Sequence, residues 1–150
     1  MAYTTLNAPI PRASDLIVDH EEFGYNFDDA NITPAGNIPF GTVVFRAKGA
    51  ASDAVAWTVV DDATDVVVAN DFAVVYGDHY GFKAGFTPKT IKAKFYNALV
   101  IKRGPVLLKE FYLKQVHGTQ LGATFDKLKS LMSDQGLVVL DDVSAFNGTL

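Results

Sequence analysis

Three histidines are the residues best suited to chemistry, because the chain contains no cysteine to serve as a thiol nucleophile or thiolate ligand. His20, His79 and His117 are far apart in the sequence, and no pair has the four-residue spacing that places two metal ligands on one helix face. Asp78 precedes His79, and a neighbouring carboxylate can orient an imidazole as a general base. Glycines on both sides of this pair favour a surface loop.

The loop around His79 supports a second hypothesis, that of a binding pocket. Between Tyr76 and Phe82, glycines free the backbone and aromatic rings offer contact area, although the same rings would also suit a turn that covers the end of a barrel. The pocket would be lined by Tyr76, His79, Tyr80 and Phe82. No nucleophile elbow, phosphate-binding loop or dinucleotide fingerprint occurs in the sequence. We therefore predict no catalytic, metal-binding or cofactor-binding residue, and no enzymatic activity.

Length and composition restrict the class of protein. A chain of 150 residues matches one domain and can bury about 68–70% of its extended surface without disulfides. The lack of cysteine is consistent with assembly in a reducing cytoplasm. No apolar run reaches the roughly 18–20 residues of a membrane span, and the N-terminus lacks the basic and apolar regions of a signal peptide. We expect a soluble protein with no membrane partner.

The net charge of −4 hides an uneven distribution along the chain. Residues 1–80 carry three basic and twelve acidic side chains, whereas residues 81–115 carry eight basic side chains and one acidic. The acidic excess would repel phosphate, so nucleic acid is not an expected partner. Two interpretations of the basic stretch stay open: lysines that protect strand edges from aggregation, or a basic face that contacts the acidic face of a neighbouring copy.

Residues 1–32 are expected to form an extended N-terminal arm. In its first twelve residues, Pro9 and Pro11 hold the chain extended and remove two backbone donors, which disfavours a helix. Strand addition to a partner is the expected mode of contact. The residues predicted to bind in this way are Tyr3, Thr4, Thr5, Leu6 and Ile10.

The second part of this arm, residues 13–31, contains six carboxylates and no lysine or arginine. Such a composition is typical of an acidic disordered tail. Aromatic residues at every second position from 23 to 27 argue instead that part of the segment docks on a surface. Short strands at residues 15–19 and 23–27 are both compatible with the pattern. The interface residues predicted here are Phe23, Tyr25, Phe27, Asp28 and Asp29.

Residues 33–150 are expected to form a single β-rich domain, opened by a turn signal at Thr33–Asn37. Short runs rich in Val and Phe follow, separated by Gly, Asp, Asn and Pro, as in a sandwich or a small barrel. The predicted strands are Gly41–Arg46, Val55–Val60, Val66–Ala69, Phe72–Tyr76, Ile91–Phe95, Leu99–Lys102, Val106–Phe111 and Leu137–Leu140. Alternation in Ile91–Phe95 places Lys92 and Lys94 on one solvated face.

One amphipathic helix is predicted from Gln120 to Gln135, with Thr119 as its N-cap and Gly136 as its C-terminal stop. Its apolar residues recur at helical spacing and are expected to pack into the core. They are Leu121, Phe125, Leu128, Leu131 and Met132. The fold class expected from these elements is mainly β with one or two short helices.

A corner is predicted at Arg103-Gly104-Pro105, between two apolar strands. Gly104 permits a backbone angle with positive φ, and Pro105 fixes the next φ, so this pair is the predicted structural corner.

The order of these motifs resembles that of bacteriophage head decoration (cement) proteins, the group that includes the lambda decoration protein. The resemblance covers residues 36–140 and rests on Gly41–Val44 after a Pro-Ala-Gly turn, on Leu99–Leu108 with its corner, and on the helix leading into Gly136–Val139. It implies a β-tulip-like body with an extended arm. The long stretch Asn70–Asn97 and the tail Asp141–Leu150 depart from the usual pattern.

The resemblance implies a structural virion protein that binds the outer surface of an expanded capsid and holds adjacent major capsid subunits against internal DNA pressure. Its partners would be the major capsid protein and further copies of itself, as a homotrimer at three-fold axes or a homodimer at two-fold axes. Arg103, beside the corner, is a further interface candidate. The alternatives are another virion surface component, such as a head fibre or receptor-binding tail protein, and a small β-barrel ligand-binding module.

Overall fold

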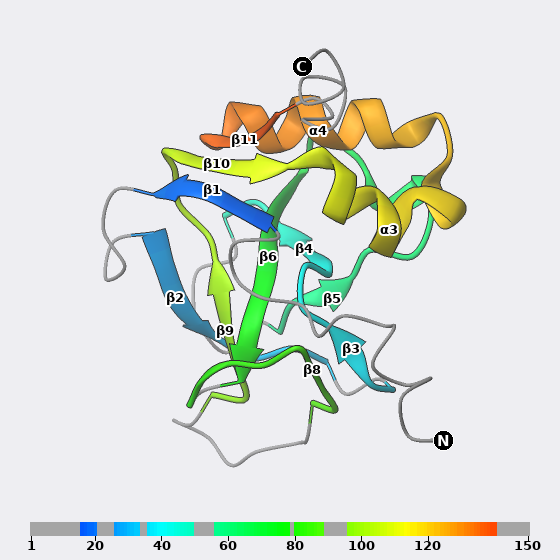
Figure 1. Ribbon diagram of the computed structural model, residues 1–150. Coiled ribbons are helices and arrows are strands. Elements are labelled where there is room, and N and C mark those ends of the chain that lie inside the picture. The colour runs from blue at the N-terminus through cyan, green and yellow to red at the C-terminus, as the bar shows by residue number, and fades with distance from the viewer. Residues whose placement is uncertain are drawn as a thin grey trace, which may run out of the picture.

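The computed structural model describes residues 16–20, 26–33, 36–49, 56–78, 80–88 and 96–140, which form three β-sheets and two main helices (Figure 1). The strands are β1 (Ile17–His20), β2 (Phe27–Ala30), β3 (Ile38–Pro39), β4 (Val43–Ala47), β5 (Thr58–Val59), β6 (Asn70–Asp78), β7 (Gly81–Phe82), β8 (Gly85–Phe86), β9 (Ala98–Ile101), β10 (Val106–Lys109) and β11 (Leu137–Leu140). The helices are the short 3-10 helix η2 (Ala63–Asp65), α3 (Glu110–Leu121) and α4 (Thr124–Asp134). The fold is mainly β with two helices, which confirms the predicted class.

The largest sheet has the strand order β2-β9-β6-β4-β5, with every pair antiparallel and β7 paired to the end of β6. The central strand β6 is buried on both faces, because Phe72 and Val74 belong to one apolar cluster and Ala73 and Val75 to the other. A strand that is buried on both faces has a continuous run of apolar residues in the sequence. This run is why the strand was predicted at the correct position.

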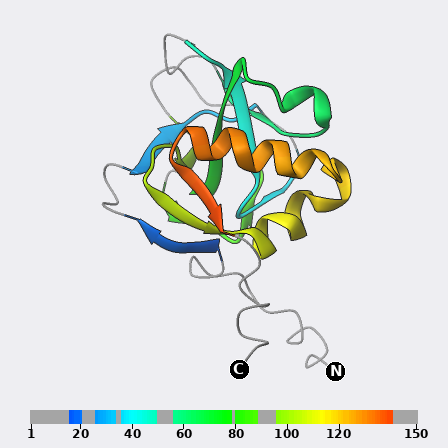
Figure 2. The ribbon, with the colours of Figure 1, turned by 90° about the horizontal axis from the view of Figure 1, so that it is seen from above.

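A second sheet has the order β1-β10-β11. Strands β10 and β11 are parallel, in register from Val106 with Leu137 to Lys109 with Leu140, and β1 pairs antiparallel with the other edge of β10. Parallel strands need a long crossover connection, which α3 and α4 supply. Both described ends of the chain therefore lie in this sheet, with β1 and β11 on either side of β10 (Figure 2).

Two helices form where one was predicted. Gly122 has a φ of +53° and separates α3 from α4, so Gln120 belongs to α3 and the prediction of Thr119 as an N-cap is wrong. The predicted strand Val106–Phe111 ends at Lys109, because α3 begins at Glu110. The buried Glu110 carboxylate lies 2.8 Å from Lys129 of α4 and joins the two helices. The predicted stop at Gly136 is confirmed, with a φ of +84° that suits a residue after a helix.

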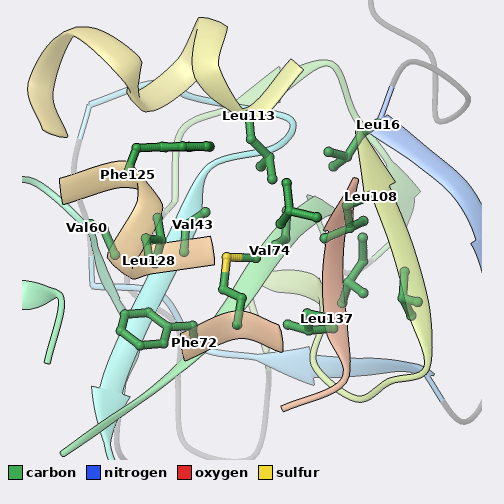
Figure 3. Packing of buried hydrophobic residues seen from close by; sticks show 14 of the residues in the cluster. Leu16, Val43, Val60, Phe72, Val74, Leu108, Leu113, Phe125, Leu128 and Leu137 are labelled. Atoms are coloured by element: carbon green, nitrogen blue, oxygen red, sulfur yellow. The ribbon is translucent and has the colours of Figure 1, made fainter. Parts of the chain in front are cut away.

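The main core lies between the large sheet and α4. Phe125, Leu128 and Met132 form the buried face of α4 and pack into the same cluster as Phe72 and Val74 of β6 (Figure 3). This arrangement confirms that the apolar stripe of the helix belongs to the core. The smaller cluster, on the other face of the large sheet, surrounds Trp57.

The edges of the large sheet do not close into a barrel. Among the described residues, only an isolated parallel bridge between Ile32 and Trp57 links the ends of β2 and β5.

Two of the predicted strands are not found as strands in the described residues. Val66–Ala69 forms a turn after η2, because β6 begins only at Asn70, and Ile91–Phe95 lies outside the described residues.

Part of the predicted arm, residues 1–32, belongs to the body of the fold. Leu16, just before β1, is fully buried, and Phe27 of β2 is only 5% exposed. Both strands pair with strands of the body, so residues 16–20 and 26–32 belong to the folded domain. A strand at residues 15–19 is confirmed in position by β1. The arm residues Tyr3, Thr4, Thr5, Leu6 and Ile10 lie outside the described residues.

The corner at Gly104 and Pro105 requires glycine for a different reason from the predicted one. Gly104 does not have a positive φ. A Cβ atom built on it would lie 2.1 Å from the carbonyl oxygen of Gly136, at the turn between α4 and β11. The two backbones touch, and the carbonyl of Gly136 also accepts a hydrogen bond from the amide of Val106 at 3.1 Å.

Replacing Gly104 with alanine should therefore lower the free energy of unfolding by about 2 kcal/mol, because the methyl group must push the corner away from Gly136. Gly36→Ala is the matched control, since a Cβ at Gly36 meets no atom within 4 Å. Urea denaturation of both variants measures the difference. Equal midpoints for the two variants would show that the close approach of the backbones has no energetic weight.

Candidate interaction surface

The predicted interface residues of β2 lie beside the corner that follows β9. Asn26 is fully buried just before β2. Its side-chain amide donates hydrogen bonds to the carbonyls of Arg103 (2.9 Å) and Pro105 (3.4 Å). The backbone carbonyl of Asn26 accepts hydrogen bonds from the backbone amides of Lys102 (2.9 Å) and Arg103 (3.2 Å). Asn26 thus holds the corner from one side while Gly136 supports it from the other.

Asp28 joins the acidic and basic parts of the chain on the surface of this corner. Its carboxylate lies 3.3 Å from the guanidinium of Arg103 and 3.5 Å from the ammonium of Lys102. All three side chains are about a third exposed. The acidic and basic segments therefore meet at Asp28 within one chain, because β2 pairs with β9. A contact between the acidic and basic faces of neighbouring copies stays a prediction.

The other interface candidates have different outcomes. The prediction for Phe27 is wrong, because its ring is buried and meets Tyr76 edge to face, with ring centroids 4.8 Å apart. Asp29 is exposed on β2, while Asp28 and Arg103 are partly exposed. Phe23 and Tyr25 lie outside the described residues.

The aromatic residues of the Tyr76–Phe82 segment do not line the predicted pocket. The rings of Tyr76 and Phe82 lie 5.4 Å apart, and both pack against Phe40. Both rings are partly buried and pack against the main core cluster. Tyr80 is 84% exposed at the turn between β6 and β7, and His79 lies outside the described residues. Tyr76 and Phe82 thus pack together against Phe40 while Tyr80 faces solvent, so these three side chains do not line one pocket.

An open pocket of about 520 Å³ lies elsewhere, between β3, β5 and η2. Its acidic rim consists of Asp61, Asp62 and Asp65. Asp62 accepts from the amide of Thr64, and Asp65 accepts from the amides of Asp61 and Asp62. The hydrogen bonds from Thr64 lower the pKa of the Asp62 carboxyl. Two of these carboxylates therefore cap η2. No group of three or more potential metal ligands occurs within the described ranges.

The outer face of the three-stranded sheet is the more extensive candidate surface. Val106 and Leu108 of β10 and Leu137 and Val139 of β11 point into the core. Strand alternation places their neighbours on the opposite face, where each is half-buried. We call this surface the outer face, defined by Leu107, Lys109, Val138 and Leu140.

The edges of this sheet are part of the same surface. In the part of the chain that the structure describes, β1 and β11 each pair with β10 alone. Each therefore presents one row of backbone groups that no described strand covers, and such rows can pair with an added strand. The sequence predicted both β10 and β11 as apolar strands, but it did not show that they are neighbours.

Comparisons with protein-family models, with curated proteins and with solved structures found no match. Within its described residues, the structure has no helix that is both long and apolar enough to cross a membrane.

Removing the side chain of Asn26 should be far more costly than removing that of Asp28. Asn26→Ala leaves two corner carbonyls without this donor in a buried place, which we expect to lower the free energy of unfolding by about 2 kcal/mol. Asp28→Ala breaks only partly exposed ion pairs, worth less than about 1 kcal/mol. Denaturant titration at low salt tests the order, and a larger loss for Asp28→Ala would contradict it.

Proposed function

We propose that this protein is a structural virion component that attaches to the outer surface of an expanded bacteriophage capsid and cements adjacent major capsid subunits. The observation that carries the proposal is the outer face with its two sheet edges, in the sheet where both described ends of the chain lie. A protein whose function is to bind a capsid surface needs a rigid apolar face of this kind.

The placement of the motifs supports the resemblance to decoration proteins. Gly41–Val44 leads into β4, Leu99–Leu108 spans β9, the corner and β10, and Gly136–Val139 leads into β11 after α4. The second and third of these segments are neighbours in space, because the corner contacts Gly136 and β10 pairs with β11. Gly41–Val44 lies in the large sheet, where β4 pairs with β5 and β6.

The outer face suits a protein partner. Three of its four residues have aliphatic side chains, and the fourth is Lys109, whose methylene stem adds apolar surface. In this proposal the outer face meets the major capsid protein. The N-terminal arm, which precedes β1 in the sequence, extends the contact by strand addition. Further copies assemble around the same capsid axis as a trimer or dimer.

A charge placed on the outer face should abolish attachment. Leu107→Glu puts a carboxylate among Val138 and its neighbours, where it would have to be desolvated on contact. Val68→Glu is the matched control, because Val68 is 65% exposed and lies in the turn before β6. The measurement is co-sedimentation with expanded, empty capsids, after circular dichroism has shown that both variants are folded.

The outcomes separate the surface from the function. Attachment of the unchanged protein and of Val68→Glu, with loss for Leu107→Glu, is the expected result. Equal attachment of both variants would show that another face binds. Failure of the unchanged protein to sediment with expanded capsids would contradict the proposed function itself.

Deleting residues 2–12 should weaken attachment strongly and leave the melting temperature nearly unchanged, because the deletion ends before β1, the first described strand of the fold. A deletion that decorates capsids as well as the full chain would rule out a binding role for the arm. A large fall in melting temperature would instead mean that the arm is part of the fold.

A further inference from the structure

A buried histidine connects the second half of α3 to the large sheet. His117 is 1% exposed, and its Nε2 atom lies 2.7 Å from the backbone nitrogen of Val43, at the start of β4. A backbone N–H can only donate, so Nε2 must be the acceptor. The ring is therefore neutral in the folded protein and carries its proton on Nδ1.

The other ring nitrogen has no compensating contact. Nδ1 of His117 is buried and has no hydrogen-bond partner among the described residues. A protonated ring would place a second N–H against the N–H of Val43, and it would bring a charge into a site without an acceptor. Burial alone accordingly lowers the pKa of the His117 imidazole to about 4.

The charged side chains on the surrounding elements do not offset this effect. The carboxylate of Glu110, at the start of α3, lies 3.6 Å from the ammonium of Lys114 and 2.8 Å from that of Lys129 on α4. Both lysines therefore pair with this one carboxylate. The remaining charged residues of α4, Asp126, Lys127 and Asp134, are exposed. On β4, Arg46 lies over the ring of Trp57, 4.3 Å from its centroid.

We propose that His117 is an acid-sensitive joint between α3 and β4: protonation of its ring breaks the bond to Val43 and releases the second half of α3 from the sheet. The strands themselves stay paired, because β4 is held separately by five registered residue pairs with β6. Near its first turn, α3 keeps two independent contacts, the ring of Tyr112 against Phe40 and the ion pair of Glu110 with Lys129. The joint thus acts on one end of one helix.

The direction of the pH effect follows from proton linkage. The folded state binds this proton less tightly than the unfolded chain, whose histidine has a pKa near 6.5. The contribution of His117 to stability is therefore complete above about pH 6.5 and is lost progressively as the pH falls toward 4. This one group should raise the unfolding equilibrium constant roughly 25-fold between about pH 7.5 and about pH 5.

The first test compares the full-length protein with His117→Gln by denaturant titration at these two pH values. Gln places a neutral oxygen within reach of the Val43 amide but cannot take up a proton in this range. We expect the pH-dependent change in the unfolding constant to be roughly 25-fold larger in the unchanged protein than in the variant, because only the unchanged protein contains this titrating site. Equal pH dependence in His117→Gln and the unchanged protein would overturn the proposal.

The second test uses the unchanged protein alone, so that it stands even if His117→Gln folds poorly. Amide hydrogen exchange, corrected for the intrinsic effect of pH, should accelerate in residues 114–121 relative to β6 when the pH is lowered to about 5. Ring nitrogen shifts should show a neutral, Nδ1-protonated His117 at neutral pH. Uniform acceleration across α3 and β6, or a ring that is charged at neutral pH, would overturn the local joint.

Discussion

The close approach of two backbones at Gly104 and Gly136 is the constraint on which the three-stranded sheet depends. A Cβ atom on Gly104 would collide with the backbone of Gly136. Because glycine has no Cβ atom, the corner after β9 can lie directly against the turn before β11. This contact sets the first rung of the parallel pair, in which Val106 meets Leu137. This contact therefore fixes the register of β10 against β11. The register in turn decides which residues of these strands face the core and which face the outer surface.

Side-chain amides complete the backbone hydrogen bonding where strands cannot. Asn97 both donates to and accepts from the backbone of Ile32, and Gln135 does the same with Phe72 at the start of β6. Asn26 plays a comparable part at the corner, and the His117 ring does so at Val43. Each of these contacts joins segments far apart in the sequence, so each fixes how one element sits on another. Buried polar groups that are satisfied in this way specify one arrangement of the core.

The uneven charge distribution has a structural outcome at Asp28. Antiparallel pairing of β2 with β9 brings the acidic end of the chain to the basic stretch within the molecule, and the ion pairs are partly exposed. Such pairs contribute little to stability and are screened by salt. The apolar outer face is different in kind, because its contribution to binding would come from burial, which salt does not screen. This contrast is why the proposed attachment rests on Leu107 and its neighbours and not on the charged corner.

The sequence by itself determined the fold class, the central strand β6, the strands β9 and β11, the apolar stripe of α4 and its stop at Gly136. These features depend on local periodicity and on glycine geometry, which a single segment displays. It also indicated glycine at position 104, but for a backbone angle that the structure does not have. Only the tertiary structure decided that β1 and β2 belong to the body, that Phe27, Tyr76 and Phe82 point inward, and that Asn26 and His117 hold distant backbone groups. The reason is physical: an isolated segment shows which face is apolar, whereas the partner of a strand edge or a buried polar atom comes from another part of the chain.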